Sequence, residues 1–376
     1  MLDFCESQQE WMAGEIERLA RAESPSTDKA ALDLCGALVL ERFASLGCRV
    51  QTLRREAAGD HIRAETGNGD RQALVLGHFD TVWPVGQIDT MPVRRDGDKL
   101  FGPGVFDMKA GIVIALTALR ALQRTSALDH LRVVVLCTAD EEVGSETSRE
   151  TIESEARRSE AVLVLEPSLP GGAVKTSRKG VGEFQLTVRG VAAHAGIDPG
   201  KGSSAIHELA RQIVGIERLQ DPATGVSVNV GIISGGSRSN VVAEHARATI
   251  DVRAPRTADA RLIEDELRAL RPQTPGTSLS MTGGFNRPAL ERTAGVVRLY
   301  ELAKDVARGL GRALDEGGTG GGSDGSFTAA LGIPTLDGLG AEGDGAHASH
   351  EHVLLSRLPW RAALVAGLLE RLAKPV

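Results

Sequence analysis

The stretch LVLGHFDTVWP, residues 74–84, carries a histidine and an aspartate two positions apart at the end of an apolar run. His78 alone could cap a buried strand, with Asp80 beginning a turn and bonding the neighbouring backbone. The alternative is that the strand presents His78 to a metal ion from its C-terminal end, where open α/β sheets form ligand crevices. Asp80 would then hold the second imidazole nitrogen. The choice depends on whether ligand-type residues also follow other strands.

Four further stretches present carboxylates or histidines after apolar runs or at loop junctions. FGPGVFDMKAG places an aspartate between a Gly/Pro turn and a helical pattern, although a helix N-cap would explain the same letters. VVVLCTADEEVGS sets three acids after a buried run, and carboxylates about 4 Å apart repel by about 1 to 4 kcal/mol unless cations offset them. A solvated acidic loop is the alternative. The candidate residues, including those of AVLVLEPS and GAEGDGAHASHEHV, are Asp107, Asp140, Glu141, Glu142, Glu166, His347, His350 and His352.

Two histidines with three carboxylates form a ligand set that suits zinc, cobalt or manganese. Because no cysteine is among them, a closed structural zinc site is disfavoured. Five side chains exceed what one open zinc ion needs, so the pattern favours two ions bridged by one carboxylate. Such ions, about 3.5 to 4 Å apart, share a hydroxide nucleophile and polarise a carbonyl. One of the adjacent glutamates is then free to act as general base.

The elements that must position these residues alternate between helix and strand in the first part of the chain. Helices are predicted near 8–22 and 28–47, and MKAGIVIALTALRALQRT has the 3.6-residue apolar period of a helix packed on a sheet. LRVVVLCTAD is a continuous β-branched run, typical of a strand buried on both faces. This alternation predicts an α/β sheet with helices on both faces. Strands are predicted near 49–55, 72–78, 131–137 and 161–165.

The pattern changes near residue 179. From there to residue 288 the chain has the pattern of a compact β-α-β-β-α-β unit, and afterwards the earlier alternation returns. We therefore expect a discontinuous catalytic, metal-binding domain, residues 1–178 and 289–376, around an inserted domain, residues 179–288. The predicted fold class is α/β, a mixed sheet with helices on both faces plus an inserted α+β, ferredoxin-like domain.

Composition limits the partners and the compartment. Hydrophobic residues make up 41% and charged residues 25% of the 376 residues, as in ordinary soluble domains. A formal net charge of -7, without a basic stripe, argues against nucleic acid as a partner. The acidic N-terminal stretch does not fit a signal peptide, and no apolar run is long enough to predict a membrane span. The four cysteines lack CxxC spacing, so reduced thiols in a cytoplasm are expected.

Taken in order, the motifs His-x-Asp, Gly-x-x-Asp-x-Lys-Ala, Asp-Glu-Glu-x-Gly, Glu-Pro and a late histidine resemble a known family. It comprises the two-zinc exopeptidases and amidohydrolases that include glutamate carboxypeptidase, acetylornithine deacetylase and succinyl-diaminopimelate desuccinylase. The resemblance implies a hydrolase-like catalytic domain in which Asp80 orients His78. It also implies that Asp107 bridges two zinc ions, with cobalt or manganese as alternatives, and that Glu141 is the general base. The implied metal ligands are His78, Asp107, Glu142, Glu166 and His347.

The late motif and the inserted domain extend the resemblance. HASHEHV fits the family pattern His-x-x-x-Glu with His347 as ligand and Glu351 as the acid, and a register with His350 as ligand is the alternative. RGVAAHAG implies that His194 stabilises the tetrahedral oxyanion, often across the interface of a homodimer formed through the inserted lid domain. Alone, His194 would be interpreted as a turn histidine.

Within the family, GGFNRPALE and EGGTGGGSDGSF are most similar to the glutamate carboxypeptidase branch. There Arg287 would be a fork for a substrate carboxylate, and the glycine run would let backbone amides approach it closely. Without the resemblance, the glycine run is interpreted as a flexible loop. The implied substrate-binding residues are Asn240, Arg253, Arg287, Gly320, Gly321 and Gly322.

The leading functional hypothesis is hydrolysis of an amide next to a free carboxylate, releasing a C-terminal glutamate or similar amino acid from an acyl or peptidyl group. The alternatives are an N-acyl amino acid deacylase or a dipeptidase with the same chemistry. A catalytically silent binding protein is disfavoured, because the general base and all five implied ligands are present. The expected partners are a small substrate with a free carboxylate and a second copy of the chain, without nucleic acid or membrane.

Overall fold

The computed structural model describes residues 1–374, and these residues divide into two compact units. The first unit contains residues 1–177, 292–318 and the described residues from 323 onward. The second contains residues 178–291 and the short segment 319–322. The second unit is therefore an insertion, and the α/β fold with an inserted α+β unit is confirmed.

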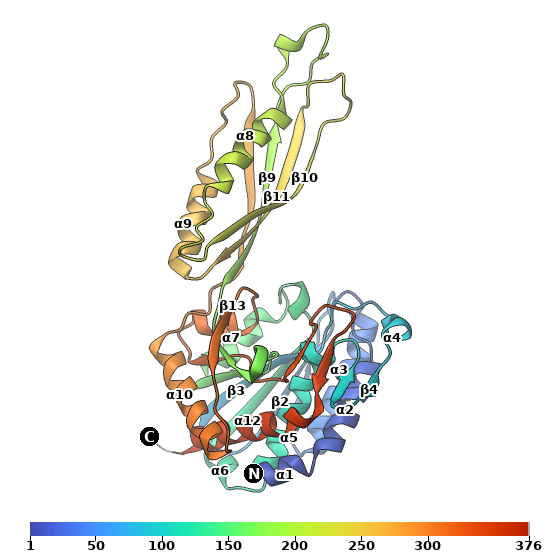
Figure 1. Ribbon diagram of the computed structural model, residues 1–376, viewed down its shortest axis with the longest axis vertical. Helices are drawn as coiled ribbons and strands as arrows, with labels where there is room; N and C mark the ends of the chain where they lie inside the picture. The colour runs from blue at the N-terminus through green and yellow to red at the C-terminus, as the bar shows by residue number, and fades with distance from the viewer. Residues whose placement is uncertain (375–376) are drawn as a thin grey trace. The chain divides into compact units, whose positions relative to one another are not determined.

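The first unit is built on a six-stranded mixed sheet with the order β1-β2-β6-β3-β7-β14 (Figure 1). The central strands β6, β3 and β7 run parallel to one another, and β1 and β2 join them in antiparallel fashion. The central strands are mostly apolar and β-branched, because both faces of the sheet are covered. The strands are β1 (Arg49–Leu53), β2 (His61–Thr66), β6 (Leu131–Thr138), β3 (Arg71–His78), β7 (Ala161–Val164) and β14 (Thr335–Leu336).

Helices cover both faces of this sheet. Along β3, Val75 belongs to the core that includes the helices α5 and α12, whereas Leu74 packs with Ile152 of α7 and Phe327 of α11. The alternation of neighbouring side chains between the two cores follows from the two-residue period of a strand. The helices of the unit are α1 (Leu2–Glu6), α2 (Gln9–Arg21), α3 (Lys29–Ser45), α4 (Gln87–Thr90), α5 (Ala110–Leu122), α6 (Ala127–His130), α7 (Arg149–Arg157), α10 (Ala294–Gly309), α11 (Gly325–Ala330) and α12 (Leu358–Ala373).

A small antiparallel sheet, β15-β16-β5-β4, carries the late histidines. Its strands are β15 (Gly343–Asp344), β16 (His352–Leu354), β5 (Lys99–Phe101) and β4 (Arg94–Asp96). Residues 345–351 connect β15 to β16, and β16 pairs with β5, which lies just before the turn that carries Asp107. This pairing brings two distant parts of the sequence together. A separate two-stranded sheet pairs β8 (Val174–Arg178) with β13 (Glu316–Thr319).

The second unit has the predicted β-α-β-β-α-β order, and its four strands form an antiparallel sheet with the order β10-β11-β9-β12. The helices α8 and α9 pack on one face of this sheet (Figure 1). Along β9, Phe184, Leu186 and Val188 are buried while the intervening side chains are not, as expected for a sheet covered on one face. The elements are β9 (Gly180–Arg189), α8 (Ala205–Glu217), β10 (Ser227–Gly235), β11 (His245–Ala254), α9 (Thr257–Arg268) and β12 (Ser278–Arg287).

Several details differ from the sequence-based expectation, including the bounds of the inserted unit, which are 178–291 and not 179–288. Strand β2 was not predicted, because HIRAET is short and mostly polar. Segment 319–322, which was expected in the catalytic domain, belongs to the second unit. Hydrogen bonds attach this segment to the second unit: Thr319 O accepts from the Lys179 backbone N–H, and Gly322 O accepts from the Arg178 side chain.

All four cysteines are buried and unpaired. Among residues 1–374, no helix is long and apolar enough to cross a membrane.

Candidate metal centre

Three neighbouring parallel strands end close to the candidate ligands. Strand β3 ends at His78, β6 is followed after Thr138 by the three acids, and Glu166 lies two residues after the end of β7. Because these strands are parallel neighbours, their C-terminal ends meet at one edge of the sheet. The sheet therefore delivers ligand-type side chains from three separate parts of the sequence to one place.

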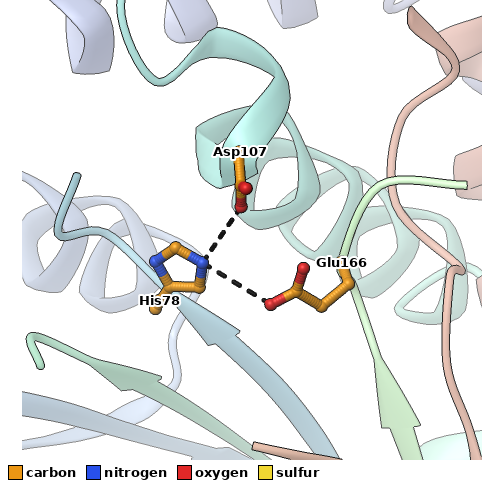
Figure 2. Close-up of side chains that lie close together, drawn as sticks. All are labelled: His78, Asp107 and Glu166. Carbon is orange, nitrogen blue, oxygen red and sulfur yellow. Dashed lines mark hydrogen bonds and ion pairs between the residues drawn. The ribbon is translucent and has the colours of Figure 1, made fainter. Parts of the chain in front are cut away.

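His78, Asp107 and Glu166 form the first group of ligand-type atoms. The Nε2 atom of His78 lies 3.2 Å from Asp107 Oδ1 and 3.5 Å from Glu166 Oε1 (Figure 2). The ligand atoms of all three side chains lie within 4.8 Å of one another. Asp107 is not the N-cap of α5, because α5 begins at Ala110 and the N-cap position is occupied by Lys109.

Asp107, Glu142 and His347 form the second group, again with ligand atoms within 4.8 Å of one another. The Nε2 atom of His347 lies 3.1 Å from Glu142 Oε2 and 3.4 Å from Asp107 Oδ2. Asp107 therefore offers Oδ1 to the first group and Oδ2 to the second. One carboxylate shared in this way is the arrangement expected between two neighbouring metal ions.

The other two late histidines lie outside both groups. His350 is exposed, and its Nε2 atom is 3.9 Å from Asp344. His352 is buried, and its ring lies 5.1 Å from that of Phe101. Of the two registers left open by the sequence, the geometry favours the one with His347.

The charges in the two groups depend strongly on one another. Burial alone would lower the pKa of His78, but the adjacent carboxylates of Asp107 and Glu166 help to raise it well above its usual value. Asp107 and Glu142 raise the pKa of His347 to about 10. Burial opposes ionisation of Asp107, but the two histidines hold the pKa of its carboxyl well below the usual range. Without metal, protons on the imidazoles therefore compensate the carboxylates, and bound cations would replace these protons.

Asp80 connects His78 with the acidic segment. The Nδ1 atom of His78 lies 3.0 Å from the backbone carbonyl oxygen of Asp80 and 3.3 Å from its carboxylate Oδ1. The backbone carbonyl and the carboxylate of Asp80 both accept from the Nδ1–H group, which leaves the Nε2 lone pair for a metal. The Asp80 carboxylate itself accepts from the Ser26 hydroxyl and from the backbone N–H groups of Glu141 and Glu142.

Asp140, the first of the three adjacent acids, lies outside the two groups. Its Oδ2 atom accepts from the backbone N–H groups of Thr147 and Ser148 and from the Thr147 hydroxyl. Asp140 thus stabilises the turn that follows the acids, and Glu141 and Glu142 remain as the two residues with candidate roles in catalysis.

The residues expected to meet the substrate lie in the second unit. His194 and Asn240 are on adjacent segments, because the Ala195 backbone N–H donates to Asn240 O at 3.0 Å. The Nδ1 atom of exposed His194 accepts from the backbone N–H groups of Gly196 and Ile197, both at 3.1 Å. The neutral ring therefore carries its proton on Nε2.

Arginines surround the glycine run within the second unit. Arg178 donates to Gly321 O and Gly322 O, and Arg253 Nη1 lies 3.5 Å from Gly320 O. Arg287 packs so closely on Gly322 that a Cβ atom there would lie 2.7 Å from its Cδ. The carbonyl groups of the run thus face arginines, a contact not anticipated from the sequence.

Arg178 was missed at the sequence level. Its only signal was a basic pair, Arg178 and Lys179, directly before strand β9. Such a pair is normally interpreted as solvated, but Arg178 is buried. The sequence identifies Glu351 only as the acid of the late motif and gives no signal for the hydrogen bonds of its carboxylate.

Comparisons with known proteins identify relatives of this chain. The sequence pattern of Peptidase family M20/M25/M40 matches residues 74–371. Carboxypeptidase G2 of Pseudomonas sp. (strain RS-16) is 30% identical over 362 residues, which cover 94% of this chain and 87% of the relative. Succinyl-diaminopimelate desuccinylase of Xanthomonas oryzae pv. oryzae (strain PXO99A) is 28% identical over 90% of this chain and 93% of the relative.

Solved structures show the same fold. Aminopeptidase PepT of Bacillus cereus ATCC 10987 superimposes with a TM-score of 0.79 at 23% identity, covering 97% of this chain and 99% of that one. The Bacillus subtilis YXEP protein, described as a dinuclear metal-binding peptidase of family M20, gives a TM-score of 0.71 at 15% identity, covering 99% of each chain. The chain therefore belongs to Peptidase family M20/M25/M40 and is a metal-dependent hydrolase of the peptidase and amidohydrolase type.

Proposed function

We propose that this protein binds two divalent metal ions and hydrolyses an amide bond next to a free carboxylate. The observation that carries the proposal is the position of Asp107, which offers one oxygen to each of the two ligand groups. The ligand set fits the ions by its chemistry, since two imidazoles and three carboxylates suit zinc, with cobalt or manganese as alternatives. Two such ions, when bound, activate water and polarise the carbonyl of the scissile amide.

Glu141 is the proposed general base. It directly precedes the ligand Glu142, and Asp80 fixes the backbone of both residues. In this role the Glu141 carboxylate takes a proton from the attacking water and passes it to the leaving amine. Because Asp80 also borders His78, one carboxylate keeps the base and a metal ligand in a fixed relation.

His194 is the proposed donor to the oxyanion that develops in the transition state. The bonds accepted by its Nδ1 atom select the tautomer with the proton on Nε2, which suits a hydrogen-bond donor. Asn240 is on the adjacent segment and is proposed to contact the substrate.

The proposed substrate carries a free carboxylate beside the scissile amide, as in a C-terminal glutamate on an acyl or peptidyl group. Arg287 at the glycine run supplies a guanidinium group suited to a carboxylate, and Arg253, whose guanidinium also pairs with Asp251, lies at the same run. The name of the relative carboxypeptidase G2 favours release of a C-terminal residue. The desuccinylase relative supports the alternative, an N-acyl amino acid deacylase, and a dipeptidase is a further alternative of the same chemistry.

A homodimer formed through the second unit is also proposed. Strand β10 is an edge strand, and it exposes two consecutive apolar side chains, Ile232 and Ile233, at 65% and 64%. An unpaired edge with exposed isoleucines is suited to pairing with a second copy of the same strand.

The test is a hydrolysis screen of N-acyl and peptidyl glutamates against the same acyl groups on other amino acids. The metal-free protein is loaded in turn with zinc, cobalt and manganese, and Glu141→Gln is the matched control. Release of free glutamate that depends on metal and on Glu141 is the expected result. Release of neutral amino acids alone would contradict the proposed preference for glutamate, and the absence of any amidase activity would contradict the proposed function.

A further inference from the structure

The carboxylate of Glu351 is fully buried and accepts four hydrogen bonds. Its Oε2 atom accepts from the Gly104 backbone N–H at 3.0 Å and from Trp83 Nε1 at 2.8 Å. Its Oε1 atom accepts from the backbone N–H groups of Phe106 and Asp107 at 2.9 and 3.1 Å. A carboxylate offers about four lone-pair positions, so the acceptor capacity of Glu351 is filled.

These bonds join three separate segments, and each segment carries a residue of the metal centre. Trp83 lies three residues after Asp80, and the donors from Gly104 to Asp107 form the turn that contains the shared carboxylate. Glu351 itself lies four residues after His347. The Gly102 backbone N–H also donates to the carbonyl oxygen of Glu351, so the late segment and the turn are joined twice.

All four partners of this carboxylate are N–H groups, which can donate hydrogen bonds but cannot accept them. A glutamine would have nearly the same shape, but it would accept at one atom and donate at the other. Two of the four N–H groups would then face an NH₂ group, and unpaired buried donors cost about 1 to 3 kcal/mol each. The site is therefore built for a carboxylate and not for an amide.

The backbone of Asp107 determines where its two oxygens lie. Those oxygens are 3.2 Å from His78 Nε2 and 3.4 Å from His347 Nε2, one in each ligand group. A shift or rotation of this backbone would move both oxygens together. Interactions that hold Asp107 in place therefore bear on both metal positions, whereas those that hold Glu142 or Glu166 bear on one.

We propose that Glu351 is a positioning residue that fixes the Asp107 turn so that one carboxylate can bridge two metal ions. The inference rests on the proposed two-metal function. It goes beyond that function in assigning a role to a residue outside both ligand groups. Its specific consequence is that loss of the Glu351 carboxylate weakens the binding of both ions, although Glu351 contacts neither.

The test uses the full-length metal-free protein with zinc alone as the probe. Zinc affinities of wild type and Glu351→Gln are measured in competition with a chromophoric chelator, and unfolding of the metal-free proteins is followed in denaturant. The expected result is a folded variant that binds both ions about 10- to 100-fold more weakly, the usual effect of losing a partner that orients the ligands. Wild-type affinity at either position would overturn the proposal.

Glu208→Gln is a matched control from the second unit. Glu208 is another fully buried carboxylate, and it accepts from the backbone N–H groups of Gln273 and Thr274 and from the Gln212 side chain. Its glutamine variant should lose stability and keep the zinc affinity of wild type. An equal loss of zinc affinity in this control would mean that the effect is general destabilisation, which would overturn the positioning role.

Trp83→Phe decides the question if Glu351→Gln does not fold. This change removes one of the four donors and leaves the carboxylate in place, so a several-fold loss of affinity at both positions is expected. Unchanged zinc binding in Trp83→Phe would then overturn the proposal. A wild-type protein that binds fewer than two ions would contradict the two-metal function itself. If Glu351→Gln instead binds two ions as tightly as wild type, only the positioning role of Glu351 would be contradicted.

Discussion

The two oxygens of the Asp80 carboxylate hold neighbouring backbone groups: Oδ2 accepts from the Glu142 N–H at 3.1 Å, and Oδ1 accepts from the Glu141 N–H at 3.2 Å. The same oxygen that accepts from Glu141 lies 3.3 Å from His78 Nδ1. One buried carboxylate therefore orients a ligand of the first group and holds the backbone that carries a ligand of the second. Asp80 links the two proposed metal positions without being a ligand of either.

Replacing Asp80 by alanine should weaken metal binding and turnover by about 10- to 100-fold, because it frees both the imidazole and the acidic segment. Ser26→Ala is the control, since it removes one hydrogen bond to the same carboxylate and leaves the other contacts in place. Metal affinity and kcat are measured for both variants. If both variants show the same metal affinity and the same kcat, the hydrogen bonds of Asp80 to the acidic segment do not contribute to function.

Removing a ligand from one group should cost one metal ion, and removing the shared ligand should cost both. We expect His78→Ala to retain a single ion and Asp107→Ala to retain none at a metal concentration that saturates wild type. Elemental analysis after gel filtration measures the stoichiometry. Two ions in His78→Ala would remove His78 from the ligand set.

Glu141 and Glu142 should separate by role although they are neighbours. Glu141→Gln should keep both ions and lose at least about 10²-fold in kcat, the scale of general base catalysis. Glu142→Gln should lose one ion, because its carboxylate is a member of the second ligand group. Metal content and kcat, measured together, check the assignment, and the reverse pattern would exchange the two roles.

Metal affinity at the second group should rise with pH. In the metal-free protein, Asp107 and Glu142 raise the pKa of His347 to about 10, so the imidazole is protonated at neutral pH. Protonated His347 stabilises the metal-free fold below its unfolded pKa, and this contribution is lost as the pH rises through about 10. A metal ion must displace this proton, so cobalt affinity should increase from pH 6 to 8 with proton release on binding.

Isothermal titration calorimetry in buffers of different ionisation enthalpy measures the proton release directly. Cobalt is suitable because binding can also be followed by its visible spectrum. His347→Ala is the control for the origin of the proton. Cobalt affinity that does not change over this pH range would contradict protonation of His347 in the metal-free protein.

His194→Ala should reduce kcat by about 10² to 10³-fold while both ions stay bound, the usual cost of losing one oxyanion donor. Arg253→Ala should instead raise KM for a substrate that carries a carboxylate. If His194 acts across a dimer, mixing His194→Ala with Glu141→Gln subunits should restore part of the activity, because some hybrid sites receive both intact groups. Mixed dimers, verified by mass, that stay inactive would assign His194 to its own chain or to no catalytic role.

Much of the fold and of the ligand groups can be predicted from the sequence, because strand signals and ligand positions reinforce each other. His78 and Glu166 follow apolar β-branched runs, and parallel strands deliver their C-terminal ends to one edge. Strong periodicity likewise identified the order of elements in the inserted unit. Strand β2 lacks such a signal because its composition is mostly polar. It forms because it pairs with a neighbouring strand on each side.

The supporting contacts could not be predicted, because they depend on distances between segments remote in sequence. The bonds of Glu351 to Trp83 and to the Asp107 turn span 268 and 244 residues. The same holds for Arg178, whose partners in the glycine run lie 143 and 144 residues away. Local patterns reveal which residues can do chemistry, and only the folded chain reveals which residues hold them in place.

A ribosome makes the parts of the metal centre in a fixed order, and the last parts come late. Strand β3 with His78 emerges long before His347 and Glu351, and helix α12, which packs on α5, follows them. At the usual elongation rates the early ligands wait on the order of tens of seconds for their late partners. During that interval the nascent chain presents clustered carboxylates without the late histidine. The first ligand group is complete once Glu166 has been made, whereas the second waits for His347, so a product that ends before His347 would lack one of the proposed ligands of the second metal ion.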